Sequence, residues 1–103
     1  MPKNEFTMKS EVWVYPGESA NWHFASVPKE ISAEIMERFG TPRRGWGSIP
    51  VFVTIRKTTW KTSIFPDKKS GMYLLPLKSE IRTKESVRSG DVISLSLRVD
   101  IPK

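Results

Sequence analysis

Ile93-Ser94-Leu95-Ser96-Leu97-Arg98-Val99-Asp100-Ile101 decides the fold class, because its apolar and polar residues alternate without a break. Alternation of this kind is typical of a β-strand with one buried face and one face in water. The turn residues Ser89-Gly90-Asp91 precede the stretch and separate it from the segment upstream. The stretch therefore predicts a strand that presents a continuous apolar face to a core.

Five further strands are predicted upstream. The residues from Phe6 to Val14 alternate in the same way, whereas Ile49–Ile55 is largely apolar on both faces, as in a central strand. Pro50 cannot donate a backbone hydrogen bond, so it is expected at the start of its strand or at a bulge. The remaining strands are expected over residues 22–27, 59–65 and 72–77.

Two helices interrupt the strands. In the first, Ile31, Ile35 and Phe39 form one apolar stripe at helical spacing. Pro28 opens this helix, and Gly40 supplies its C-cap. A shorter helix is expected over residues 79–87.

The predicted order is therefore β-β-α-β-β-β-α-β, with short strands and glycine or proline between them. This order favours a single mostly-β domain over residues 1–103, a small barrel whose open ends are covered by two helices. An internal echo supports the barrel, because Val27-Pro28-Lys29-Glu30-Ile31 and Leu77-Lys78-Ser79-Glu80-Ile81 each join a strand to a helix. The echo predicts two similar β-β-α-β halves related by a pseudo-twofold axis.

Composition limits the function classes. The 103 residues carry a net charge of +6, with a pI near 9.8, which attracts polyanions and acidic surfaces. The chain has no cysteine and one histidine, which leaves no disulfide, no thiol nucleophile and no zinc site. It contains no glycine-rich phosphate loop, no apolar run long enough to cross a bilayer, and no signal-peptide core. We therefore expect a basic cytoplasmic protein without cofactor, metal or membrane contact.

Cations, tryptophans and hydroxyl side chains gather around two of the predicted strands. The glycine-containing loop before residue 49 carries cations beside a tryptophan, an arrangement that suits an anion and a stacked ring. The strand over residues 59–65 and the following helix junction supply a second set. An alternative is that the tryptophans are core residues covered by arginines. The candidate ligand-binding residues are Arg43, Arg44, Trp46, Trp60, Lys61, Ser63 and Lys78.

Catalysis is less well supported than binding. His23 is the only histidine, and a strand histidine with a satisfied hydrogen bond explains it better than a catalytic base does. Lys61 and Ser63 share one strand face, but a Ser/Lys hydrolase needs a desolvated lysine. No catalytic residue is assigned, and the chain is expected not to be an enzyme.

A series of short elements runs in order through most of the chain from about Phe6: Tyr15-Pro16-Gly17, Trp22-His23-Phe24, Val27-Pro28-Lys29-Glu30-Ile31-Ser32, Arg44-Gly45-Trp46-Gly47-Ser48-Ile49-Pro50-Val51, Trp60-Lys61-Thr62-Ser63-Ile64-Phe65-Pro66, Tyr73-Leu74-Leu75-Pro76-Leu77-Lys78 and Gly90-Asp91-Val92. With these elements the chain resembles the DUF1905 family, a bacterial and archaeal domain family with no assigned function. The resemblance implies a double-split β-barrel, an architecture shared with DNA-binding antitoxins and transition-state regulators. One departure is Arg56-Lys57-Thr58, where relatives tend to carry glycine; a non-glycine residue at positive φ is uncommon, so the sequence does not decide the geometry of this turn.

The leading hypothesis is a non-enzymatic module that binds an anionic ligand, with nucleic acid as the first candidate partner. A small-molecule-binding or catalytic pocket between the Trp46 loop and the Trp60 strand is the second hypothesis. A module that docks onto another protein is the third. One chain can supply both halves of such a barrel, which is compatible with a monomer, but the sequence leaves the oligomeric state open.

Overall fold

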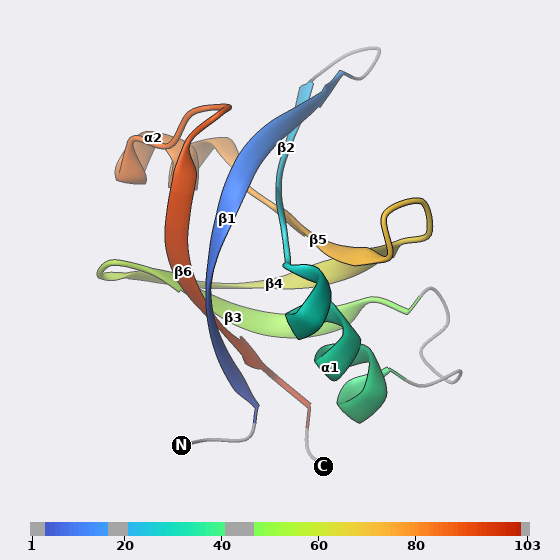
Figure 1. Cartoon of the computed structure of the whole chain (residues 1–103). Coiled ribbons are helices and arrows are strands. Elements are labelled where there is room, and N and C mark those ends of the chain that lie inside the picture. Colours follow the sequence, from blue (N-terminus) through green and yellow to red (C-terminus); the bar gives the residue numbers. More distant parts are fainter. Residues whose placement is uncertain (1–3, 17–20, 41–46, 102–103) are drawn as a thin grey trace.

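The computed structural model describes residues 4–16, 21–40 and 47–101. Within these ranges, six antiparallel strands close into a barrel, and two helices lie near opposite ends of it (Figure 1). The strands follow the order β1-β2-β5-β4-β3-β6 around the barrel. The elements are β1 (Glu5–Pro16), β2 (Asn21–Ser26), α1 (Lys29–Phe39), β3 (Ile49–Ile55), β4 (Thr58–Asp67), β5 (Met72–Pro76), α2 (Ser79–Glu85) and β6 (Val92–Val99). The predicted mostly-β barrel and its element order are confirmed.

The barrel interior is filled by alternate residues of the strands, as the sequence pattern predicts. In β6, Leu95, Leu97 and Val99 are buried, and Leu97 pairs with Phe6 of β1 and Val53 of β3. Pro50 is the second residue of β3, where a missing donor is tolerated. The prediction that this proline lies at the strand start is confirmed.

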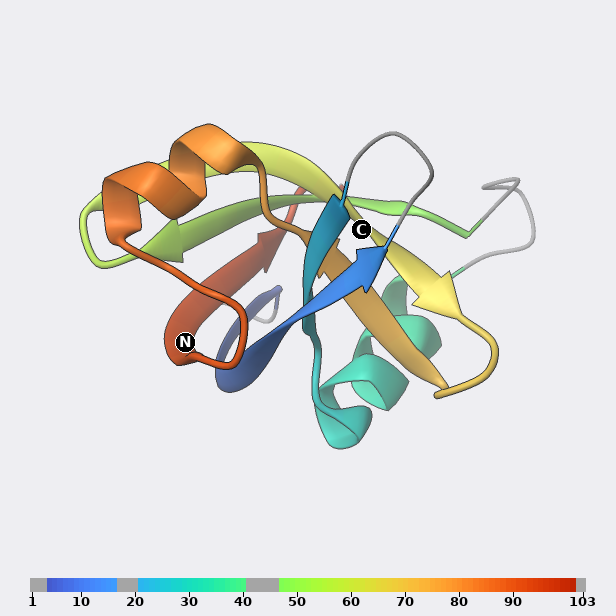
Figure 2. The same cartoon turned by 90° about the horizontal axis from the view of Figure 1, so that it is seen from above.

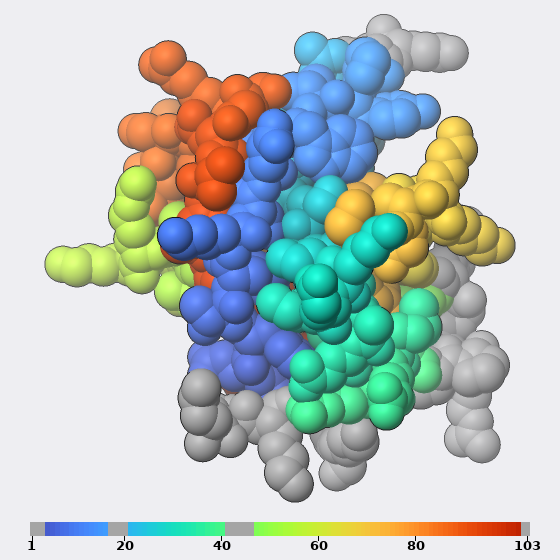
Figure 3. Space-filling view, in the orientation of Figure 1, coloured from blue at the N-terminus to red at the C-terminus, as the bar shows by residue number. Residues whose placement is uncertain are grey.

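Two residues separate each helix from the strand before it. Pro28 is the N-cap of α1, and Ile35 and Phe39 bury the apolar face of this helix. At its C-cap, a side chain on Gly40 would come within 2.7 Å of the Met36 carbonyl oxygen, so the backbones approach too closely for a larger residue. Figure 3 shows α1 packed along the side of the barrel, next to the turn between β4 and β5.

Helix α2 is shorter than the sequence predicts, ending at Glu85 instead of continuing to Val87. Ser86 takes up the left-handed conformation, with φ of 55°. The Val87 N–H then donates to the Arg82 carbonyl at 2.9 Å, which closes the last turn. No helix in the described ranges is long and apolar enough to cross a membrane.

The two halves of the chain have the same topology. Exchanging β1-β2-α1-β3 with β4-β5-α2-β6 leaves the cyclic strand order unchanged. Equivalent hydrogen bonds join the halves: Val27 donates to the Tyr73 carbonyl, and Leu77 donates to the His23 carbonyl, each at 2.9 Å. The predicted pseudo-twofold arrangement is therefore present in the strand order and in these hydrogen bonds.

The turn between β3 and β4 has Arg56 at positive φ, although glycine, which relatives tend to carry in this turn, is the residue that favours this conformation. Arg56 has φ of 53°, in the left-handed region that costs a side-chain-bearing residue about 1–2 kcal/mol. Its guanidinium reaches α2, where it lies 3.2 Å from the carboxylate of the buried Glu85. Thr58 also donates to this carboxylate, at 2.5 Å. Figure 2 shows α2 alongside this hairpin, so the turn is anchored to a helix.

Candidate functional site

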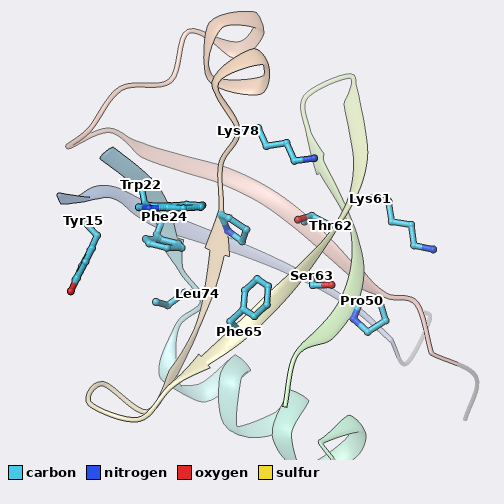
Figure 4. A pocket seen from close by; sticks show the side chains of 11 residues that line it. Tyr15, Trp22, Phe24, Pro50, Lys61, Thr62, Ser63, Phe65, Leu74 and Lys78 are labelled. Atoms are coloured by element: carbon cyan, nitrogen blue, oxygen red, sulfur yellow. The ribbon is translucent and has the colours of Figure 1, made fainter. Parts of the chain in front are cut away.

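A groove of about 820 Å³ lies on the outer surface of the barrel (Figure 4). Its walls are mostly aromatic rings, prolines and a leucine, with two lysines and two hydroxyl residues. Among these described lining residues there is no carboxylate. We call this hollow the aromatic groove. Its lining residues are Tyr15, Trp22, Phe24, Pro50, Lys61, Thr62, Ser63, Phe65, Leu74, Pro76 and Lys78.

Strand pairing places these side chains together although they are distant in the sequence. Tyr15 of β1 lies opposite Trp22 of β2, and Phe65 of β4 lies opposite Leu74 of β5. Phe24 of β2 lies opposite Pro76, which joins the two pairs across the β2–β5 contact. Because alternate residues of these strands fill the core, the aromatic set between them faces outward.

Three of the rings are open to solvent. The exposed fractions are 60% for Tyr15, 58% for Trp22 and 44% for Phe65. Phe24 lies opposite Trp13 of β1, with ring centroids 5.2 Å apart, and the Trp13 indole donates to the Ser26 hydroxyl at 2.9 Å. The groove therefore combines exposed rings with one whose position is supported by a neighbour.

The two lysines of the groove differ in their surroundings. The Lys61 ammonium lies 3.1 Å from a carboxylate oxygen of Asp100 and 5.7 Å from the centre of the Phe52 ring. Lys78 is exposed and has no ion-pair partner among the residues that the structure describes. Lys78 is therefore the lysine most available to an anionic ligand.

The structure brings three of the seven predicted site residues together. Lys61, Ser63 and Lys78 line the aromatic groove. Trp60 does not line it; this side chain is on the opposite strand face from Lys61 and packs against the core. The remaining three, Arg43, Arg44 and Trp46, lie outside the described residues.

Sequence reasoning missed the aromatic residues that form most of the groove. In β2, Trp22 and Phe24 alternate with His23 and Ala25, so the period-two pattern does place both rings on one face. That pattern does not say which face is the outer one, and hydrophobicity alone favours burying the rings. On the opposite face of β2, Ala25 packs into the core, with 1% of its surface exposed.

His23 and Lys61 do not form the environments that the catalytic alternatives need. The Arg82 guanidinium lies 3.5 Å from His23 Nε2, and burial together with this positive charge lowers the pKa of His23. Lys61 is largely exposed, whereas a Ser/Lys hydrolase needs a lysine removed from water. Within residues 4–16, 21–40 and 47–101, no group of three potential ligands could hold a metal ion.

The lowered pKa of His23 predicts a loss of stability in mild acid. Below pH 6.5, the usual pKa of histidine, the unfolded chain binds a proton at His23 more readily than the folded chain does. This contribution is present above pH 6.5 and is lost as the pH falls through the lower folded pKa. Urea unfolding of wild type and His23→Gln, between about pH 7.5 and pH 5, will show a smaller decrease for the variant. Equal decreases would contradict the assignment.

Comparison with known proteins places the chain in a family without assigning a function. A family model described as a domain of unknown function, DUF1905, matches residues 9–97 and so covers most of the chain. No curated protein matches the sequence. The matched span includes all eleven residues that line the aromatic groove.

Proposed function

The chain belongs to the DUF1905 family of domains of unknown function, and we propose that its aromatic groove binds single-stranded nucleic acid. The observation that carries the proposal is the exposure of Tyr15, Trp22 and Phe65 in one groove. Small monomeric domains seldom leave such a set of rings open to water without a partner. Unpaired bases are a suitable partner, because each has a flat face that stacks on an aromatic side chain.

The charge around the groove favours an anionic partner over a neutral one. Lys78 and Lys61 line it, and the described lining includes no carboxylate that would repel a phosphate. The net charge of +6 adds a long-range attraction for polyanions. Aromatic faces beside cations are the combination by which single strands are bound without strong sequence preference.

The span of the groove favours a single-stranded nucleic acid over an isolated aromatic ring as the ligand. Tyr15 is on β1 and Phe65 is on β4, with β2 and β5 between them. Three inter-strand spacings amount to about 14 Å along the curved sheet. One base cannot contact both residues, whereas consecutive nucleotides can.

A small planar anion is the second candidate, because a volume of about 820 Å³ lies within the usual range for small-molecule sites. The dependence of affinity on oligonucleotide length separates the two candidates. A site for single-stranded nucleic acid will bind a thymidine decanucleotide more tightly than a dinucleotide at equal nucleotide concentration. A small-molecule site will bind the two equally.

The test of the proposed function is the effect of Trp22→Ala on binding of a labelled thymidine decanucleotide, followed by fluorescence anisotropy at low salt. Loss of one stacking contact, worth about 1–3 kcal/mol, weakens binding by about 5- to 150-fold. Val92→Ala is the matched control, because Val92 is 66% exposed and does not line the groove. Duplex DNA will bind more weakly than the single strand, since its bases are already stacked. Absence of strand binding, or equal affinities for wild type and Trp22→Ala, would refute the proposal.

A further inference from the structure

The aromatic groove continues into two smaller hollows beside α2. The first, of about 260 Å³, shares Trp22, Pro76 and Lys78 with the groove and also reaches His23 and Arg82. The second, of about 310 Å³, shares Arg82 with the first. The three hollows are therefore neighbours on the surface, joined by the residues that they share. The second hollow is lined by Arg82, Thr83, Ser86, Val87 and Arg88.

The lining changes from the groove to the hollows beside α2. The groove is lined by four aromatic rings, two prolines and a leucine, beside two lysines and two hydroxyl residues. The first hollow keeps apolar residues and adds His23 and Arg82, and the second is lined by two arginines, two hydroxyl residues and Val87. No carboxylate is among the described residues that line either hollow. The acid of α2 that is buried, Glu85, instead engages Arg56 and Thr58 of the β3–β4 hairpin. We call Lys78, Arg82 and Arg88 the basic track.

The central member of the basic track is held in place by the protein. Arg82 Nε donates to the Leu77 carbonyl oxygen at 3.2 Å, and its terminal nitrogen lies 3.5 Å from His23 Nε2. A guanidinium has five N–H groups, so these two contacts leave others for a ligand. Arg88 and Lys78 are exposed on either side, and neither has an ion-pair partner within the described part of the chain.

We propose that the basic track binds the phosphates of the strand whose bases stack in the aromatic groove. The proposal rests on the proposed function and extends it, because it assigns the phosphodiester backbone a path past α2. Phosphate oxygens suit Arg82 and Arg88, since guanidinium groups bind them through paired N–H donors. The nucleic-acid strand thus leaves the groove at Lys78 and passes Arg82 before Arg88.

The salt dependence of strand binding tests the track. For a single strand, the slope of log K against log salt concentration is about −0.7 for each phosphate neutralised. Arg88→Gln and Arg82→Gln will each make the slope shallower by about 0.7 for a decanucleotide. Lys29→Gln is the control, because Lys29 is exposed at the start of α1, near the opposite end of the barrel (Figure 1). Arg88→Gln will not change the affinity for a dinucleotide, which fills only the groove.

The outcomes separate the track from the groove. Slopes for Arg88→Gln and Arg82→Gln equal to wild type, with Trp22→Ala still weakening binding, would overturn the track and leave the groove. Shallower slopes with no effect of Trp22→Ala would support the track and overturn stacking in the groove. If wild type binds no oligonucleotide, both are refuted. Arg88→Gln keeps the test valid if Arg82→Gln fails to fold, because the Arg88 side chain is exposed.

Discussion

Leu97→Ala is expected to lower the free energy of unfolding by about 2–5 kcal/mol, the largest effect of any substitution considered for this chain. Leu97 has no exposed surface and lies opposite Phe6 on one neighbouring strand and Val53 on the other. Truncating its isobutyl side chain to a methyl group leaves a cavity that strands paired on both sides cannot easily close. A domain is stable by only about 5–15 kcal/mol, so the variant loses a large part of that stability.

Val92→Ala is the matched control for this prediction. Val92 is on the same strand but is 66% exposed, and truncating it should change stability by less than about 0.5 kcal/mol. Urea denaturation followed by tryptophan fluorescence measures both variants. Similar losses for the two would mean that Leu97 is not in the core of the folded barrel.

Ser32→Ala is expected to cost about 1–3 kcal/mol although it removes a single oxygen atom. The Ser32 hydroxyl is buried, donates to the Val27 carbonyl at 2.9 Å and accepts from the Tyr73 N–H at 3.0 Å. It therefore ties α1 to the end of β2 and the start of β5, two strands that carry the aromatic groove. Alanine would leave a buried donor and a buried acceptor unpaired.

Ser10 offers a contrasting control for the same substitution. This side chain is also buried, but its hydroxyl has no hydrogen-bond partner in the described part of the protein. Ser10→Ala should therefore be neutral or stabilising, because it removes an unpaired buried polar group. Thermal and urea denaturation of both variants give the comparison, and the reverse order of stability would contradict these hydrogen-bond assignments.

Much of the fold could be predicted because local patterns determine it. The alternation around Leu97 predicts a half-buried strand, and the stripe through Ile35 and Phe39 predicts α1. The end of α2 was less predictable, because it depends on Ser86 in a left-handed conformation that few serines adopt. The geometry of the turn at Arg56 could not be predicted for a related reason: the contact that anchors this turn comes from Glu85, 29 residues away in the sequence.

The candidate site was predicted only in part. Lys61, Ser63 and Lys78 were singled out and do line one groove. Trp60 was expected beside them, but in a strand the next residue points to the other face, and Trp60 packs toward the core. Trp22 was missed because a sequence pattern does not say which strands lie side by side.

The amino-acid sequence by itself determined which residues form strands and helices and which strand positions share a face. These properties follow from interactions between near neighbours in the chain, so they can be read from spacing. The tertiary structure alone decided which face of β2 is the outer one and which strands adjoin. Closure of the barrel pairs β2 with β5 across about 50 residues, and only this pairing brings Trp22, Phe65 and Lys78 to one surface.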